Sequence, residues 1–351
     1  MSQSASQSAS HHAPSCTASI IIVNYNAGPR LAKCLQHLRA QNVTDFETII
    51  IDNASTDGSL EGLDQSGLKV SIMREKENHG FAKANNMAAQ VARGTWLAFL
   101  NPDAYAQPDW LGSLLAAAER YPHIKAFGST QLSAENPEII DGLGDVYHAF
   151  GVPYRGGFGQ PADDLPPDGA CFSPCAAAML IRRDCFDDLG GFDERYFCYG
   201  EDVDLGFRLR LAGGHAVQVA DAVVHHEGSG VSGRYSDFTV YHGNRNRIWG
   251  WFKNMPLALL IPLLPFHLAI NSYLLIRAYG VGIGPAYARA LRDGFGGLGA
   301  IMAARRDMPP RRAPLLSIIR ALSWSPLKVS RRAVDLKPLP GTGANRQSAD
   351  F

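Results

Sequence analysis

The feature that most restricts the fold of this chain is a series of short apolar runs in its first hundred residues. Four runs of five residues each, of which the first two are rich in β-branched side chains, stand at 19–23, 47–51, 69–73 and 96–100. Continuous apolar runs of this length are typical of strands that are buried on both faces, as in parallel sheets. The sequence therefore predicts a buried, mostly parallel sheet in this part of the chain.

Helical patterns lie between or after these runs. One, with leucines at i, i+4 and i+7, begins after Pro29, a residue that the first turn of a helix tolerates. A second covers 81–91, and a third covers 110–121 with Asp109 as its predicted N-cap. In order, the elements read β-α-β-α-β-α-β-α, which predicts an α/β fold with a doubly wound, mostly parallel sheet and flanking helices.

The middle of the chain is less regular. Residues 176–182 predict another buried strand, 202–212 a helix, and 215–219 and 222–226 two short strands. The stretch 141–159 is rich in glycine and aromatic residues, so we expect a long functional loop there.

Charge and cysteine content exclude several classes of protein. Lys and Arg together number 33, as do Asp and Glu, so a generally basic nucleic-acid-binding protein is disfavoured. Six cysteines do not make a disulfide scaffold, and no second Cys/His pair joins Cys171 and Cys175 in a zinc pattern. No G-x-G-x-x-G follows the first predicted strand and no Walker loop occurs, which counts against a nicotinamide site and against a kinase or ATPase.

Polar residues follow each of the four predicted strands, at 24–26, 52–58, 77–81 and 101–104. Each loop alone is explained by the turn preferences of Asn, Asp and Gly. All four, however, open at the carboxyl edge of one sheet, where α/β proteins bind ligands. We predict a carboxylate-lined nucleotide crevice in which a divalent cation separates the carboxylates from a pyrophosphate. Asp103 is placed to hold that cation, unless it only caps the next turn.

A second acidic cluster begins the predicted helix at 202–212. Glu201, Asp202 and Asp204 are favoured there in any case, because carboxylates stabilise helix N-termini. Asp204 can also pair with Arg208 one turn later. A general base requires an ionised carboxylate held beside the acceptor hydroxyl, and either Glu201 or Asp202 could supply it.

Two histidines, His225 and His226, end another predicted strand. A histidine in this position is more often hydrogen-bonded by its neighbours than bound to metal. With Asp103 as a partner, one of the two is a candidate metal ligand. An oxygen-rich site accepts both Mg²⁺ and Mn²⁺, so the sequence does not choose between them.

Seven stretches together resemble the family 2 glycosyltransferases, which have the GT-A fold, and among them the bacterial rhamnosyltransferase-like branch. They occur in the family's order and cover roughly 19–250. The stretches are IIIVNYN (20–26), IIIDNASTDGS (49–59), ENHGFAKANN (77–86), FLNPDA (99–104), GGFDERYFCYGEDVDLGFRLRLAGG (190–214), VVHHEGS (223–229) and YHGNRNRIW (241–249).

The resemblance implies a role for individual residues. Asp202 matches the family's catalytic base, with Glu201 and Asp204 as supporting acids. Asp103 is the last carboxylate of the family's metal motif, and His226, rather than His225, matches a further metal ligand. The residues implied in donor binding are Val23, Tyr25 and Asp52 around the nucleoside, Asp57 and Asn85 in support, and Asp103.

The resemblance also implies a reaction. Such enzymes invert the anomeric centre in one displacement, with Mg²⁺ or Mn²⁺ beside the departing nucleoside diphosphate. The branch points to dTDP-L-rhamnose as donor and to a saccharide or lipid-linked saccharide of lipopolysaccharide or cell-wall polymers as acceptor. The alternatives are a UDP- or GDP-linked donor, or an inactive sugar-binding or scaffold protein. A processive synthase is disfavoured because the Q-x-x-R-W motif is absent.

The C-terminal third has the composition of a membrane-associated region. Residues 257–276 are a 20-residue apolar stretch whose Pro262 and Pro265 make it a poor straight span. Residues 286–332 hold ten Lys or Arg and two Asp, as in a tail lying on an anionic membrane surface. A soluble helical subdomain with a solvated basic face is the alternative.

The expected location follows from the donor. Nucleotide sugars are cytosolic, and a single span would place the basic tail outside, against the positive-inside tendency. Basic residues on both sides of the stretch favour a re-entrant or in-plane helix in a peripheral or monotopic protein on the cytoplasmic face of the inner membrane. They are Arg245, Arg247 and Lys253 before it, and Arg277, Arg289 and Arg292 after it.

These patterns divide the chain into regions. The ends are predicted to be disordered, without a secretory signal at the start, and the His11–His12 pair is interpreted as part of a solvated tail. The regions are a leader (1–18), a catalytic domain (19–250) with a nucleotide-binding half (19–122) and an acceptor half (123–250), a membrane-associated helical region (251–335) and a tail (336–351).

Overall fold

The four apolar runs are all strands of one ten-stranded sheet in the computed structural model, which describes residues 15–228 and 236–339. A separate hairpin pairs β8 (Asp145–His148) with β9 (Val152–Arg155). The strands of the sheet are β1 (Cys16–Asn24), β2 (Phe46–Asp52), β3 (Val70–Arg74), β4 (Gly94–Leu100), β5 (Ala104–Ala106), β6 (Ala126–Ser133), β7 (Ile140–Leu143), β10 (Gly169–Cys171), β11 (Ala178–Arg182) and β12 (Ala216–His226).

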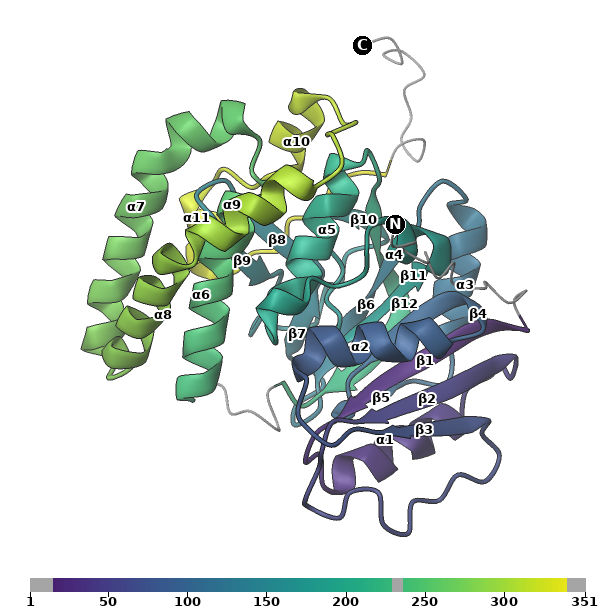
Figure 1. The fold of residues 1–351 in the computed structure, drawn as a ribbon. Helices are drawn as coiled ribbons and strands as arrows, with labels where there is room; N and C mark the ends of the chain where they lie inside the picture. The colour runs from purple at the N-terminus through teal and green to yellow at the C-terminus, as the bar shows by residue number, and fades with distance from the viewer. Residues whose placement is uncertain (1–14, 229–235, 340–351) are drawn as a thin grey trace, which may run out of the picture.

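The sheet is mixed and mostly parallel, as predicted (Figure 1). Its order is β10-β12-β6-β11-β4-β1-β2-β3, with β5 paired to β12 and β7 paired to β6. From β12 to β3, four neighbouring pairs are parallel, and the two antiparallel ones both involve β11. The carboxyl ends of β1, β2 and β4 therefore lie at one edge of the sheet.

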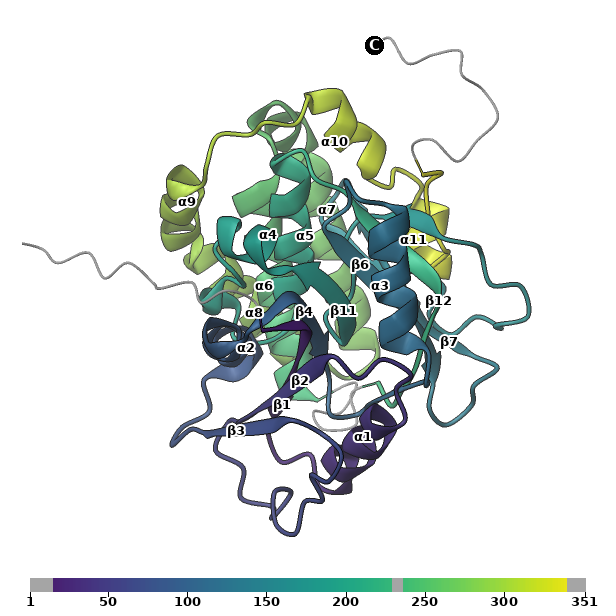
Figure 2. The same ribbon diagram turned by 90° about the vertical axis from the view of Figure 1, so that its right-hand side faces the viewer.

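Helices cover both faces of the sheet, which explains why its central strands β1, β2 and β4 are mostly apolar (Figure 2). On one face lie α1 (Pro29–Arg39) and α3 (Trp110–Arg120), whose buried leucine and tryptophan side chains share one core cluster, and α3 packs against β6 and β12. On the other face lie α2 (Gly80–Val91), α4 (Arg183–Asp188) and α5 (Glu201–Leu211). The predicted flanking helices are thus confirmed.

Two local predictions were wrong, and a third, the N-cap of α3, was right in its position only. The chain crosses from β2 to β3 through turns at 53–69, so the strict alternation of strand and helix fails there. The two strands expected at 215–219 and 222–226 are one strand, β12, whose register shifts between Val219 and Val223. Asp109 stands at the N-cap of α3 without a capping bond, because its carboxylate accepts from Asn42 instead.

The stretch 141–159 is not a loop. Most of it forms β7, β8 and β9, and β7 extends the central sheet beside β6. Glycines at positive φ make the connections, among them Gly144 (φ 71°) between β7 and β8 and Gly151 (φ 81°) in the hairpin. The glycine content that suggested a loop thus reflects tight connections between short strands.

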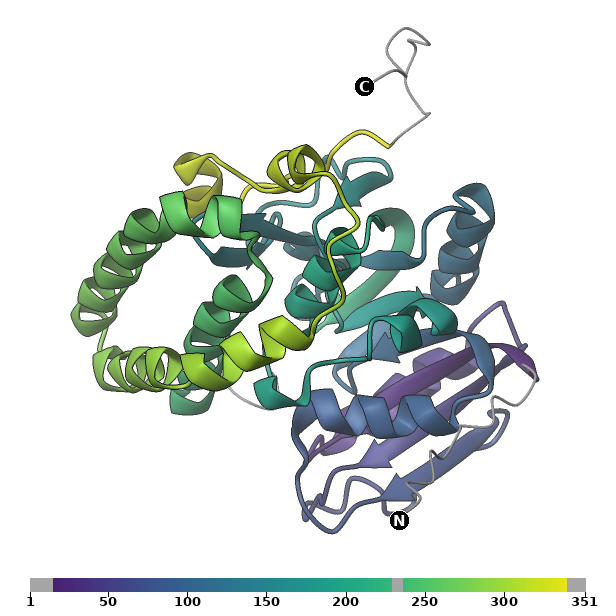
Figure 3. The same ribbon diagram turned by 45° about the horizontal axis from the view of Figure 1, so that its top comes forward.

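The C-terminal third is helical and lies beside α5, away from β1–β3 (Figure 3). A short 3₁₀ turn at Glu194–Tyr196 precedes α5. The helices that follow are α6 (Asp237–Asn254), α7 (Leu257–Gly280), α8 (Gly284–Gly296), α9 (Leu298–Asp307), α10 (Leu315–Ala321) and α11 (Pro326–Arg331).

Helix α7 runs without interruption through both of its prolines for 24 residues, roughly 36 Å. It is the one described helix that is long and apolar enough to cross a membrane, and 22% of its most apolar window is buried. Its protein-facing side includes the polar residues His267 and Asn271. Its outer side exposes large apolar side chains, among them Leu257, Ile261, Phe266, Tyr273, Ile276 and Tyr279.

Several predicted boundaries differ from the structure. Cys16–Ala18, assigned to the leader, belong to β1, and residue 250 falls inside α6. Lys337, assigned to the tail, exchanges backbone hydrogen bonds with Ala170, and Leu339 is buried in the core beside the sheet. The predictions for 1–14, including His11–His12, and for 340–351 lie outside the described residues.

Two of the basic residues expected to flank α7 do not face outward. Arg247 is buried and donates to Asn271 and to the hydroxyl of Tyr287. Lys253 is buried and ion-paired with Asp193 and Asp204. These two positive charges are bound to buried partners inside the protein, so fewer basic residues before α7 are available at the surface than predicted.

Candidate functional site

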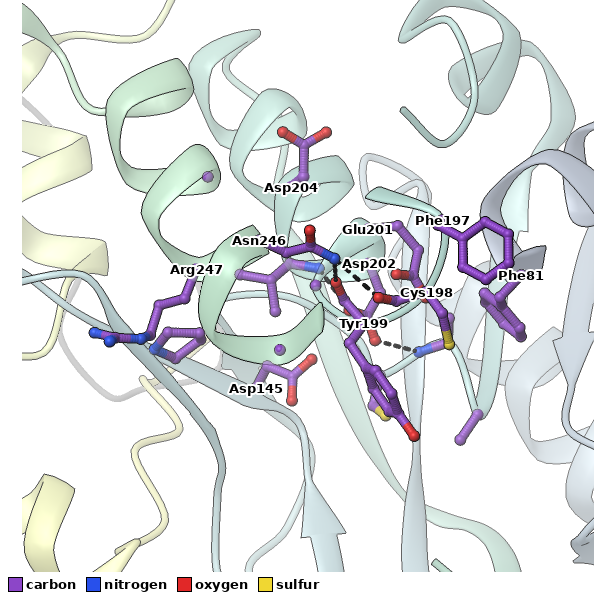
Figure 4. A pocket seen from close by; sticks show the side chains of 18 of the residues that line it. Phe81, Asp145, Phe197, Cys198, Tyr199, Glu201, Asp202, Asp204, Asn246 and Arg247 are labelled. Carbon is purple, nitrogen blue, oxygen red and sulfur yellow. Dashed lines mark hydrogen bonds between the residues drawn. The ribbon is translucent and has the colours of Figure 1, made fainter. Parts of the chain in front are cut away.

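A pocket of about 830 Å³ opens at the carboxyl edge of the sheet. One part of it is lined by the loops after β1 and β4 and by the start of α2. The other part is lined by the β8–β9 hairpin, the start of α5 and the inner face of α6 (Figure 4). Of the residues predicted for the site, the pocket lining includes Val23, Tyr25, Asp103, Glu201, Asp202, Asp204 and His226.

Asp103 and His226 meet in this pocket. Oδ1 of Asp103 lies 3.3 Å from Nε2 of His226, and both side chains are buried. Nδ1 of His226 lies 2.7 Å from Oδ2 of Asp141, and that same oxygen is ion-paired with Arg155. The imidazole is therefore fixed on its Nδ1 side, with Nε2 directed toward Asp103.

The two carboxylates beside His226 favour the protonated, positively charged form of its imidazole. Burial alone would lower the pKa of His226, but Asp103 and Asp141 raise it to about 9. Burial would likewise raise the pKa of Asp141, but Arg155 and His226 lower it. A site that stabilises a proton on Nε2 between carboxylates suits a divalent cation there as well, since carboxylate and imidazole are both metal ligands.

Asp202 lies in the first turn of α5, which follows Gly200 in the left-handed conformation (φ 82°). Its Oδ2 accepts from the backbone N–H of Ala176 at 3.0 Å, and its Oδ1 accepts from the N–H of Val203 at 2.8 Å. Hydrogen bonds to both oxygens fix the direction of the carboxylate. The side chain is partly exposed and faces the pocket (Figure 4).

The segment before α5 is held in a strained conformation by α6. Phe197 and Tyr199 adopt positive φ angles of 64° and 72°, which residues other than glycine rarely adopt. The amide of Asn246 donates to the carbonyl oxygens of Cys198 at 2.8 Å and Tyr199 at 2.6 Å (Figure 4). Asn246 thereby fixes the wall of the pocket next to Asp202.

Glu201 and Asp204 occupy very different surroundings. Glu201 is buried, and its Oε2 has no hydrogen-bond partner in the described part of the chain. Burial, followed by the charge of Asp202, raises the pKa of Glu201 well above its usual range. Burial would also raise the pKa of Asp204, but Lys253 and Arg208 hold it well below its usual range. The predicted pair between Asp204 and Arg208 is present at 2.8 Å.

Three residues predicted for donor binding are not in the lining of the pocket. Asp52 is buried and accepts from the side-chain amide of Asn24 at 2.9 Å. Asp57 accepts from the backbone N–H of Gly28, which ties the loop after β2 to the loop after β1. Asn85 donates to the carbonyl of Phe81 in its own helix. In this structure these three side chains shape the loops around the pocket and do not form its surface.

Sequence reasoning missed Asp141, Asp145, Arg155 and Asn246. The first three lie in the stretch that was interpreted as a loop, where the only signal was a pair of aspartates four residues apart. Asn246 lies in a quoted motif but was given no role. Their contacts join positions far apart in the chain, and no local pattern reports such contacts.

The fold and this pocket define a GT-A-type glycosyltransferase, and comparison with known proteins agrees. Residues 19–190 match the family described as Glycosyl transferase family 2. The N-acetylglucosaminyl-diphospho-decaprenol L-rhamnosyltransferase of Mycobacterium tuberculosis (strain ATCC 25618 / H37Rv) is 31% identical over 293 residues, which cover 74% of this chain and 92% of that protein. The chain belongs to glycosyltransferase family 2.

Two further similarities have narrower scope. The O-antigen biosynthesis protein RfbC of Myxococcus xanthus is 34% identical over 227 residues, which cover 59% of this chain and 17% of that protein. Among solved structures, GalNAc-T7 with UDP, GalNAc and Mn²⁺ has a TM-score of 0.58 at 17% identity, covering 84% of this chain and 59% of that chain. At that identity the structural match supports the fold alone.

Proposed function

We propose that this enzyme transfers a sugar, L-rhamnose from dTDP-L-rhamnose, to a hydroxyl of a saccharide or lipid-linked saccharide in cell-surface polysaccharide synthesis. The observation that carries the proposal is that Asp202 lines the same pocket as the buried pair of Asp103 and His226. The Mycobacterium tuberculosis relative, an N-acetylglucosaminyl-diphospho-decaprenol L-rhamnosyltransferase, supports this sugar and a lipid-linked acceptor. The Myxococcus xanthus O-antigen biosynthesis protein supports the assignment to cell-surface polysaccharide synthesis.

Asp202 is the proposed general base. Its two backbone hydrogen bonds hold the carboxylate in the pocket. It takes the proton of the acceptor hydroxyl as that oxygen attacks the anomeric carbon, and the bond to the nucleoside diphosphate breaks on the opposite side. One displacement of this kind inverts the anomeric configuration.

Asp103 and His226 are the proposed ligands of Mg²⁺ or Mn²⁺. The oxygen and nitrogen donors converge, and the carboxylate of Asp141 fixes the ring as second-sphere groups do in metal sites. The bound cation would supply positive charge against the departing diphosphate. The structure of GalNAc-T7, which was solved with both UDP and Mn²⁺, is consistent with such a site.

The donor nucleoside is proposed to lie against Val23 and Tyr25. Tyr25 is 40% exposed although it lines the pocket, so its ring is available to stack on a base. Asp52, Asp57 and Asn85 act indirectly in this proposal, because they hold the loops after β1 and β2 and the start of α2.

A donor panel tests the proposed substrate. Purified enzyme is offered dTDP-, UDP- and GDP-linked sugars with a lipid-linked saccharide acceptor, with and without a chelator, and the released nucleoside diphosphate is measured. We expect dTDP from dTDP-L-rhamnose, loss of release with chelator, and recovery on addition of Mn²⁺ or Mg²⁺. Preferred release of UDP or GDP would contradict the donor, and release that resists chelation would contradict the metal.

We further propose that α7 lies in the plane of the cytoplasmic face of the inner membrane. Its apolar outer side and inward-facing His267 and Asn271 are arranged as expected for a helix whose outer surroundings are lipid. Further exposed apolar residues occur in and beside α10 and α11, including Leu316, Trp324 and Leu327.

Vesicle binding tests this location. The wild-type protein is expected to float with vesicles rich in anionic lipid, and Ile261→Glu combined with Ile276→Glu to reduce the bound fraction by tenfold or more, because each charge enters the apolar layer. The control is Glu61→Lys, an exposed change far from α7. Equal flotation of the double variant would contradict the proposal, and so would protease protection of a C-terminal tag in sealed inverted vesicles.

A further inference from the structure

Asp145 is a buried acid whose side chain the fold leaves without a partner at one oxygen. It begins β8, where its backbone N–H donates to the carbonyl of Ser173 at 2.8 Å. The residue is 5% exposed, it lines the pocket, and its Oδ2 has no hydrogen-bond partner within residues 15–228 and 236–339. A buried carboxylate in this state is costly unless it is neutral or accepts a hydrogen bond.

The nearest ionisable groups are those around Asp202. One oxygen each of Asp145 and Asp202, together with Sγ of Cys175, lie within 4.8 Å of one another (Figure 4). A small rotation or one bridging water closes such a separation into a hydrogen bond. Two further charged groups influence this cluster. Glu201 is another acid whose charge interacts with those of Asp145 and Asp202. Arg155 is a positive charge that stabilises ionised Asp145, but it is already ion-paired with Asp141.

Two carboxyl groups this close share a proton more easily than they both ionise. Both oxygens of Asp202 accept a backbone hydrogen bond, whereas Oδ2 of Asp145 accepts none from the described residues. Hydrogen bonding therefore assigns the negative charge to Asp202 and the proton to Asp145. Consistently, burial first and the charge of Asp202 second raise the pKa of Asp145 well above its usual range, against the opposing effect of Arg155.

We propose that Asp145 is a positioning residue that stays protonated in the working enzyme and donates its hydrogen bond to Asp202. The neutral acid keeps Asp202 ionised and fixes its free lone pair toward the acceptor. During transfer the acceptor proton passes to Asp202 and Asp145 keeps its own, so the proton balance of the reaction is unchanged. The inference rests on the proposed role of Asp202 as base.

The pH dependence of kcat/KM separates this arrangement from an ionised Asp145. The acid limb of this pH profile reports protonation of the base, Asp202. Asp145→Asn keeps a neutral hydrogen-bond donor, so the acid limb is expected to stay in place and kcat to remain within about threefold of wild type. Asp145→Leu removes the donor, so the acid limb is expected to move to higher pH. An ionised Asp145 would repel charge on Asp202, and both variants would then move the acid limb to lower pH. That result, or an unmoved limb in Asp145→Leu, would overturn the proposal.

Infrared difference spectroscopy tests the proton without relying on activity or on Asp145→Leu folding. The spectrum of wild type minus Asp145→Asn at neutral pH is expected to contain the carbonyl band of a protonated carboxyl group. Glu201→Gln is the matched control, because it removes another buried acid of the same pocket and leaves the band of Asp145 in place. A difference spectrum with only carboxylate bands would overturn the proposal. If Asp202→Asn proved active while the band was present, the proposed base would fail instead.

Discussion

Asp202→Asn is expected to lower kcat for sugar transfer by about 10²–10⁴-fold, the range typical of a lost general base. Asparagine preserves the shape of the side chain but cannot take the acceptor proton. Its amide oxygen can still accept from the N–H of Ala176, so the local fold is expected to persist. The measurement is steady-state transfer to a saturating acceptor.

Donor binding distinguishes loss of the base from loss of the pocket. The Kd of Asp202→Asn for the donor nucleotide, measured by calorimetry, is expected to stay within about threefold of wild type, since the proposed donor contacts lie elsewhere. Asp188→Asn, at an exposed carboxylate of α4, serves as the control and is expected to behave as wild type. Near-normal turnover of Asp202→Asn would show that another group is the base.

Asp204→Ala is expected to lower the free energy of unfolding by about 3–5 kcal/mol, although it lies only two residues from Asp202. Asp204 is buried and accepts from Lys253 at 2.8 and 2.9 Å, from Arg208 at 2.8 Å and from Asn254 at 2.7 Å. Alanine would leave the buried ammonium of Lys253 with Asp193 as its remaining carboxylate partner among the described residues. Urea unfolding followed by circular dichroism measures the change.

The same carboxylate makes stability depend on pH with a definite sign. Since the folded-state pKa of Asp204 is held below its usual range, its contribution is complete above the unfolded-state pKa and is lost as the pH falls below it. Wild type is therefore expected to lose stability in acid more steeply than Asp204→Ala. Asp188→Ala, at an exposed position, is the control for removal of a carboxylate. A loss below about 1 kcal/mol for Asp204→Ala would contradict the structural role.

The sequence predicted the strands and helices of the nucleotide-binding half because their signals are local. The run at 19–23 is apolar at every inward and outward position except Ser19, as a strand covered on both faces requires, and it is the centre of β1. The stretch 53–69 between β2 and β3 has no clear helical or strand pattern. A helix was expected there only because strands and helices were assumed to alternate, and the structure has turns at these residues.

The candidate site was predicted only where a residue stands at the end of an element. Asp103, Asp202 and His226 each follow or begin a strand or helix, so their position on the sheet edge could be inferred. The contact between Asp141 and His226 joins residues 85 positions apart, and only the register of β6 between β7 and β12 brings them together. Whether a buried acid such as Asp145 has a partner likewise depends on three-dimensional packing.

The most direct test of the proposed mechanism is anomalous diffraction from crystals of the enzyme grown with Mn²⁺ and dTDP. We expect a manganese peak at Asp103 and His226, in contact with the diphosphate, and an unmetallated Asp202 facing the sugar side of the pocket. A peak on Asp145, Cys175 and Asp202 would contradict the mechanism, because the proposed base would then be a metal ligand. So would a dTDP complex with no metal at Asp103 and His226.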